Sequence, residues 1–304
     1  MRRPDAGRVR AWLRLVGGGA VLAVVMWRMG TGPVVDGLRA LSVTALLGGL
    51  LLGVPVTVCC AWRWRVVGRA AGLPIGRSEA VAAVYRSQLL NSVLPGGVLG
   101  DVHRGVRQGR AVSDVPGSLR VVAWDRVAGQ VVQLAVAVMV LLALPSTVPR
   151  GAVLVLGLAL VTFLLLVARR GGPWALLTAW PATATASTLA VGAHVATFLL
   201  AARTAGVTAP TPRLLPLALV VLLAMAVPAN VAGWGPREGV AAWAFAAAGL
   251  GADQGLAAAV AYGVLSLVAS LPGLVVVAAE RLPVTRSASA PPAAPARVEV
   301  VVGG

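Results

Sequence analysis

The chain alternates long apolar runs with short segments that carry most of its charge. A helix rises about 1.5 Å per residue, so roughly 20 apolar residues cross the hydrocarbon layer of a membrane. No run alternates apolar and polar positions, as the strands of an outer-membrane barrel do. The pattern therefore predicts an all-α polytopic membrane protein. Its nearly uncharged runs lie at residues 15–27, 40–61, 127–144, 151–168, 181–202, 214–235 and 255–279, with a weaker one at 80–95.

The arginines between these runs predict the orientation, because basic residues accumulate in cytoplasmic loops. The N-terminal arginines precede residues 15–27, which we interpret as an uncleaved first span. With both termini in the cytoplasm, we expect about six full spans and a transmembrane domain over residues 1–283. The Pro- and Ala-rich residues 284–304 are expected to form a disordered cytoplasmic tail. The other expected cytoplasmic loops contain Arg63, Arg65, Arg69 and Arg77; Arg104, Arg107 and Arg110; and Arg169 and Arg170.

Two segments do not cross in this scheme and instead enter and leave the membrane from one side. Residues 80–95 dip in from the cytoplasm, and residues 214–250 dip in from the outside. Proline and glycine interrupt both dips, which frees backbone groups that only protein or water can satisfy. Two oppositely oriented broken hairpins predict an inverted repeat with a binding site between the breaks. The interrupting residues are Pro95, Gly96 and Gly97 in the first dip, and Pro228, Gly233, Gly235 and Pro236 in the second.

Composition agrees with a membrane as the main solvent. The chain is 58% hydrophobic and only 12% charged, and its mean hydropathy is +0.87, beyond the range of soluble domains. The net charge of +16 lies in short loops and not on one face, so we expect no nucleic-acid partner. All 26 basic residues are arginine, which is typical of a GC-rich bacterial genome and favours a bacterial plasma membrane.

The sequence lacks the residue patterns of metal sites, disulfides between loops, catalytic triads and ATP-binding loops. Cys59 and Cys60 are adjacent within an apolar run, which favours small buried hydrophobic residues over a zinc site or a disulfide between loops. His103 and His194 are the only histidines and lie far apart, so neither a metal site nor a catalytic triad is supported. A lone histidine such as His194 in an apolar span is more often bonded to a neighbouring helix. No phosphate-binding loop of an ATP-driven pump is present, and we expect no cofactor.

A first polar cluster surrounds the break of the first dip. Arginine is a planar donor fork suited to phosphate, and glycine lets backbone amides approach an anionic head group. A cytoplasmic loop that obeys the positive-inside rule is the competing interpretation. The candidate binding residues of this cluster are Asn91, Pro95, Gly96, Gly100, Asp101 and Arg104.

A second cluster is Asp125 with Arg126, at the head of the run 127–144, followed by Gln130 and Gln133. Charges at such depth are costly unless they are paired or face a wet cavity. For Asp101 and Asp125, a structural salt bridge to a nearby arginine and a contact with substrate are open alternatives.

The third cluster follows the break of the second dip, where Pro236, Arg237 and Glu238 would open a half-helix. A carboxylate suits the positive end of the helix dipole, and free amides there can receive an anion. An ordinary helix N-terminal role is the alternative for Glu238. The candidate binding residues are Asn230, Gly233, Gly235, Arg237 and Glu238.

Together the three clusters resemble the flippase-like transmembrane region of the lysylphosphatidylglycerol synthase family. That family carries an Asn-x-x-x-Pro-Gly-x-x-Gly-Glu-x-x-Arg motif, a Glu-Arg pair and a Pro-x-x-x-Gly-Gly-x-Gly-x-x-Glu motif. Residues 91–104, the pair Asp125 and Arg126, and residues 228–238 match them in order. Asp101 and Asp125 stand where the family more often has Glu. The resemblance implies a stand-alone flippase-like region without the aminoacyl-transfer domain of full-length synthases.

The sequence thus favours a lipid flippase or transporter with no enzymatic activity. It would move an anionic or aminoacylated phospholipid, or a polyprenyl-phosphate lipid, between leaflets. Arg104 and Arg126 would bind phosphate, while Asp101, Asp125 and Glu238 would position them or bind a cationic group. Membrane lipids are the expected partners, and the oligomeric state stays open.

Two other function classes remain. The chain could be a membrane scaffold or accessory subunit that presents lipid to a separately encoded lipid-modifying transferase. It could also be an intramembrane transferase that uses Asp101 or Glu238 as acid or base, although no D-x-D motif supports this reading.

Overall fold

The computed structural model describes residues 32–94, 97–146, 148–169, 175–225 and 235–281. Within these ranges the regular elements are helices and no strand occurs, which confirms the expected all-helical class. The expected first span at 15–27 and the tail at 284–304 lie outside the described residues. The helices are α2 (Gly32–Arg39), α3 (Val43–Ala70), α4 (Arg77–Val93), α5 (Leu99–Ala111), α6 (Val115–Ala143), α7 (Arg150–Arg169), α8 (Ala175–Thr204), α9 (Thr211–Ala224), α10 (Pro236–Ala247), α11 (Ala252–Ser270) and α12 (Pro272–Arg281).

Several helices have the length and composition of membrane spans. Among the described residues, 4 stretches qualify: Val43–Ala70, Val115–Ala143, Ala179–Thr204 and Ala252–Glu280. Large apolar side chains point outward, with Val43 73% and Leu51 70% exposed on α3 and Leu158 67% exposed on α7. Such exposure is costly in water but not in lipid. The chain is therefore a multi-pass helical membrane protein, and the count of six spans stays a prediction.

The arginines after the run 40–61 were expected in a loop, and this prediction was wrong. Arg63, Arg65 and Arg69 lie on α3, which continues to Ala70. Arginine is a good helix former, so a change from apolar to charged residues marks the edge of the membrane and not the end of a helix. The helix ends only before Gly72, whose φ is +76°.

The same correction applies further along the chain. Arg104, Arg107 and Arg110 lie on α5 and not in a loop. Helix α6 begins at Val115, with the Asp114 side chain accepting a hydrogen bond from the Gly117 amide at 2.8 Å. Because Asp114 caps the helix, α6 begins well before the apolar run at residues 127–144.

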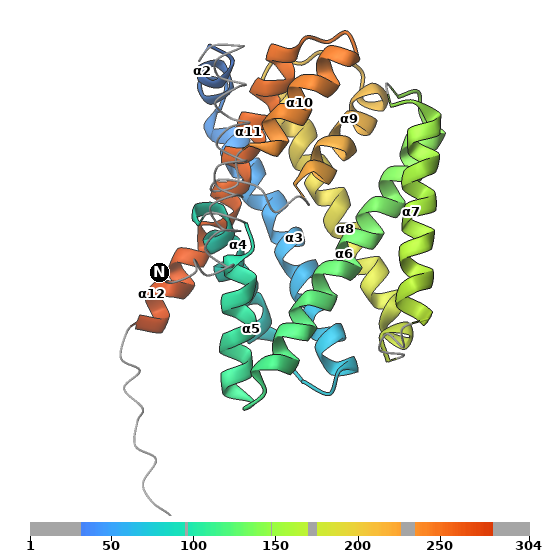
Figure 1. Ribbon diagram of the computed structural model, residues 1–304. Coiled ribbons are helices and arrows are strands. Elements are labelled where there is room, and N and C mark those ends of the chain that lie inside the picture. Colours follow the sequence, from blue (N-terminus) through green and yellow to red (C-terminus); the bar gives the residue numbers. More distant parts are fainter. Residues whose placement is uncertain (1–31, 95–96, 147, 170–174, 226–234, 282–304) are drawn as a thin grey trace, which may run out of the picture.

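Two hairpins of short helices approach the centre of the molecule from opposite ends (Figure 1). Helices α4 and α5 form the first, with α5 at the lower end of the view, and α9 and α10 form the second at the upper end. The first is tight, since a methyl group on Gly100 would lie 2.1 Å from the Ser87 carbonyl oxygen. In the second, α10 begins at Pro236 as predicted, after Gly235 with φ +122°.

Two apolar cores hold the hairpins in place. One joins the four helices α8, α9, α10 and α11 through Phe198, Leu214, Phe245 and Tyr262, all 0% exposed. The other joins α3, α4 and α6 around Trp64, which is 1% exposed. The long helices α3 and α8 pack against each other, and α3 contributes residues to both cores, so it connects the two hairpins.

Candidate functional site

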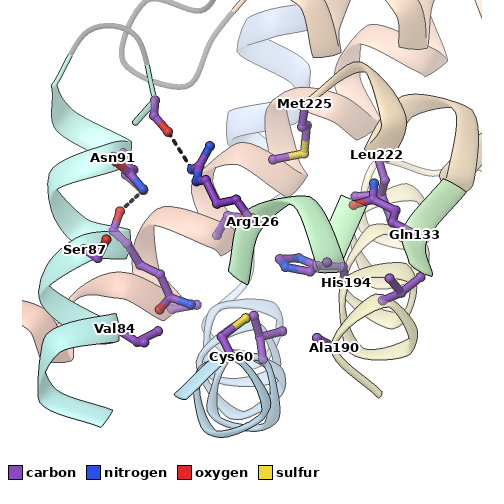
Figure 2. Close-up of a pocket in the computed structure, with 18 of the residues that line it drawn as sticks. Cys60, Val84, Ser87, Asn91, Arg126, Gln133, Ala190, His194, Leu222 and Met225 are labelled. Carbon is purple, nitrogen blue, oxygen red and sulfur yellow. Dashed lines mark hydrogen bonds between the residues drawn. The ribbon is translucent and has the colours of Figure 1, made fainter. Parts of the chain in front are cut away.

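A cavity of about 380 Å³ lies where the two hairpins meet the long helices. The first hairpin lines it with Asn91 and Gly97, and the second lines it with Met225 and Pro236. Figure 2 shows Arg126 between Ser87 and Asn91 on one side and Met225 and Leu222 on the other. Gly97 and Pro236, which belong to the two predicted breaks, therefore line one cavity. Helices α3, α6, α8 and α11 complete the walls with Cys60, Arg63, Gln130, Gln133, Ser187, His194, Tyr262 and Ser266.

Asp101 is the first centre of a charged network beside this cavity. Its Oδ1 accepts a hydrogen bond from the Ser87 hydroxyl at 3.0 Å and lies 3.0 Å from Arg104 Nη2. Its Oδ2 accepts from the Asn91 amide at 2.9 Å and from Arg126 Nε at 2.8 Å. Asp101 is only 7% exposed. A buried carboxylate with this many donors is held as an anion in one orientation.

Asp125 is the second centre, on α6. It accepts from Arg63 Nε at 2.8 Å and from Arg104 Nη2 at 3.1 Å, and it is 1% exposed. Arg63 also donates to the Ser187 hydroxyl at 3.1 Å on α8. The Arg104 guanidinium lies 4.5 Å from the centre of the Trp64 ring, a cation–π contact. The salt-bridge alternative is thus observed for both aspartates, and it ties α3, α5, α6 and α8 together.

The two candidate phosphate-binding arginines differ in access. Arg104 is 4% exposed and contacts both aspartates. The Arg126 side chain is 40% exposed, although it pairs with Asp101 and donates to the Gly97 carbonyl at 3.0 Å. Arg126 can therefore contact a molecule in the cavity without first breaking the core of the network.

The second hairpin contributes one ion pair. Arg237 lines the cavity, and its guanidinium lies 5.5 Å from the Tyr262 ring centre. Glu238 accepts from Arg237 Nε at 2.9 Å and from the Gly235 amide at 2.7 Å. Glu238 is 0% exposed. Through its hydrogen bond with the Gly235 amide, its carboxylate caps the start of α10.

The structure brings together most of the described candidates but not all of them. Glu238, Gly100 and Gly235 are described but are not among the cavity-lining residues. Pro95, Gly96, Asn230 and Gly233 lie outside the described residues. The candidates that line the cavity are Asn91, Asp101, Arg104, Asp125, Arg126 and Arg237.

Sequence reasoning missed Arg63 and Ser187 as parts of the site. A usable signal existed for Arg63, because a buried Asp125 requires cationic partners and Arg63 follows an apolar run directly. The expected partner of His194 on a neighbouring helix is confirmed, since its Nδ1 lies 2.9 Å from the Tyr262 hydroxyl. Cys59 is buried as expected, whereas Cys60 also lines the cavity.

The fold and the site define a class: a multi-pass helical membrane protein with a charged internal cavity between two broken hairpins. The family model described as Lysylphosphatidylglycerol synthase TM region matches residues 12–273. The chain belongs to this family, as the three clusters indicated. No curated protein and no solved structure matches the chain.

Proposed function

We propose that the protein moves an anionic or aminoacylated phospholipid, or a polyprenyl-phosphate lipid, between the leaflets of a bacterial plasma membrane. The head group would occupy the central cavity while the acyl or prenyl chains stay in lipid. The cavity volume of about 380 Å³ falls within the roughly 300–1,000 Å³ typical of small-ligand sites. The proposal includes no chemical step, and it places both termini in the cytoplasm.

The observation that carries this proposal is the partly exposed guanidinium of Arg126 inside an otherwise buried charge network. Its side chain is 40% exposed, against 4% for Arg104. Guanidinium groups bind phosphate through charge-assisted hydrogen bonds. Gln130 and Gln133, one and two turns further along α6, also line the cavity and offer amide donors and acceptors to a polar head group.

The opposite directions of the two hairpins support movement across the membrane. Residues from the break of each hairpin line the same cavity, so a site at this depth can be reached by rearranging either hairpin. This arrangement fits an inverted repeat, in which alternating access comes from one half rocking against the other. We infer that the ion pairs around Asp101 and Asp125 keep the first half rigid during this motion.

The experiment is leaflet exchange of head-group-labelled lipids in liposomes that contain the purified protein. Phosphatidylglycerol, lysylphosphatidylglycerol, a polyprenyl phosphate and phosphatidylcholine would be compared. Wild-type protein should accelerate exchange of one or more of the first three over phosphatidylcholine. Arg126→Gln should slow this exchange by about tenfold or more, because one charge-assisted hydrogen bond contributes about 1.5–3 kcal/mol.

Arg120→Gln is the matched control, since Arg120 lies on the same helix α6 and is exposed. It removes the same charge away from the cavity and should leave exchange unchanged. Equal exchange by Arg126→Gln and wild-type protein would refute the proposed role of Arg126. Lipid binding without exchange for any lipid would favour the alternative of a scaffold that presents lipid to a separate transferase.

A further inference from the structure

A second cavity, of about 200 Å³, lies on α3, α4, α5 and α12. It shares Arg104 with the central cavity but otherwise has its own lining. Three arginines line it together with two carboxylates, so it is a charged cavity and not an apolar packing defect. Its charged and polar lining residues are Trp64, Glu79, Arg86, Arg104, Arg107, Gln108 and Glu280.

Three buried donors at this cavity have no hydrogen-bond partner within the described part of the chain. They are Trp64 Nε1, Arg86 Nε and Arg104 Nε. The three residues are 1%, 5% and 4% exposed, and all of them line the second cavity. Buried N–H groups are nearly always paired in native proteins. Three unpaired donors around one cavity therefore indicate a missing acceptor.

The cavity already holds one anion from the protein itself. Glu280, near the end of α12, pairs with both Arg86 and Arg107. Its side chain is 29% exposed and that of Arg107 is 52% exposed, so this edge of the cavity is open to the outside. Helix α12 packs tightly on α4, where a methyl group on Gly273 would lie 2.6 Å from the Tyr85 carbonyl oxygen.

We propose that this cavity is a second anion site that takes a phosphate group in exchange for the Glu280 carboxylate. Phosphate carries more acceptor oxygens than a carboxylate, so one group can accept from Arg86 and Arg107 and from further donors as well. Arg104 lines this cavity and has no partner for its Nε within the described residues, while its Nη2 stays bound to Asp101 and Asp125. Glu79 lies on the same lining, and its negative charge opposes the binding of any anion, so the three arginines have to outweigh it.

The chemistry is that of a phosphate group with at least three free oxygens, and two sources can supply it: a lipid phosphomonoester or free phosphate. The site differs from the proposed transport cavity, because Arg126, Gln130 and Gln133 do not line it within the described residues. The proposed binding here therefore uses none of these three central-cavity residues, and Arg104 is the residue that the two cavities share.

The test is calorimetric titration of inorganic phosphate into the purified full chain in a maltoside detergent, which contains no phosphate. Glu280→Gln removes the competing carboxylate and should bind phosphate at least about tenfold more tightly than wild type, since charge-assisted bonds contribute about 1.5 kcal/mol or more. Glu280→Gln combined with Arg107→Gln should lose this gain. The Arg107 side chain is 52% exposed, so its replacement removes no buried charge.

Two controls separate this site from general charge effects and from the central cavity. Asp253→Asn makes the same charge change at an exposed position on α11 and should bind phosphate as wild type does. Glu280→Gln combined with Arg126→Gln should keep the tighter binding, even if Arg126→Gln abolishes lipid exchange. The proposal is wrong if Glu280→Gln binds phosphate no more tightly than Asp253→Asn. It is also wrong if the gain in affinity survives the replacement of Arg107 or is lost on the replacement of Arg126.

Short-chain phosphatidic acid, a lipid phosphomonoester, then identifies the source, with a short-chain diacylglycerol at equal concentration as control. Displacement of phosphate by the phospholipid but not by the diacylglycerol supports a lipid phosphomonoester as the ligand. Phosphate binding that the phospholipid leaves unchanged supports free phosphate.

Discussion

The two hairpins share an architecture and differ in how they are held. Helices α4 and α5 carry Ser87, Asn91, Asp101 and Arg104, which bind one another and α6 through ion pairs and hydrogen bonds. Helices α9 and α10 are held mainly by an apolar core that includes α10 residue Phe245. In α10, the buried charges are one adjacent pair, Arg237 and Glu238.

This difference shows that one cavity can have two kinds of wall. The charged wall depends on many partners from several helices, so losing one carboxylate takes an ion-pair partner from two arginines at once. The apolar wall depends on packing and on a local cap, so changes there affect fewer groups. Replacements in the two walls should therefore differ in how much stability they cost. Four experiments follow, in order of decreasing expected effect.

Replacing Asp125 should have the largest effect. Asp125→Ala leaves Arg63 and Arg104 without a shared carboxylate in a buried site, at a cost of about 3–5 kcal/mol. We expect a large fall in the melting temperature of the purified protein and a loss of monodisperse material in size-exclusion chromatography. Asp36→Asn, an exposed position on α2, should leave both unchanged. Wild-type stability in Asp125→Ala would mean that the network does not hold the first wall.

Replacing Glu238 should cost less than replacing Asp125. Glu238→Ala removes the acceptor of the Gly235 amide and one partner of Arg237. It takes a carboxylate from one buried arginine, whereas Asp125→Ala takes one from two, so the cost lies near the lower end of about 3–5 kcal/mol. Thermal unfolding of both variants in the same detergent measures the difference. A larger loss for Glu238→Ala would reverse the comparison of the two walls.

A smaller loss is expected from a methyl group at Gly235. Its φ of +122° is a conformation that residues with a Cβ rarely adopt, so Gly235→Ala should cost more than about 1 kcal/mol. Gly192→Ala on α8, where an added Cβ meets nothing within 4 Å, should be neutral or slightly stabilising. Equal melting temperatures for the two variants would show that the start of α10 tolerates a different backbone.

Cysteine labelling should report the cavity with the least disturbance. Cys60 lines the central cavity, whereas Cys59 packs against Ala186 and Ala190 on α8. A small polar thiol reagent should label Cys59→Ser protein at Cys60 faster than it labels Cys60→Ser protein at Cys59, as read by intact mass. A transported lipid added beforehand should slow only the labelling of Cys60. Equal rates for both cysteines would argue that Cys60 does not face an accessible cavity.

Much of the candidate site could be predicted, because charged residues beside apolar runs are conspicuous in the sequence. Asp101, Arg104, Asp125 and Arg126 are charged residues next to apolar runs, where a charge is costly without a purpose. Arg63 was assigned to a loop for the same reason that the others were noticed: it follows an apolar run. Arg63 could have been placed in the site only by asking which arginines neutralise the buried Asp125.

The membrane environment, the helical class, the family and the Pro- and Gly-rich interruptions could all be predicted from the sequence. Those features depend on local hydropathy, on proline and glycine, and on short motifs, all of which are encoded along the chain. Which charges pair and which face a cavity could be seen only in the folded chain. Arg63 and Asp125 are separated by 62 positions along the chain, and Arg86 and Glu280 by 194. Ion pairing depends on distance in space, which the packing of α3, α4, α6 and α12 sets and no local pattern records.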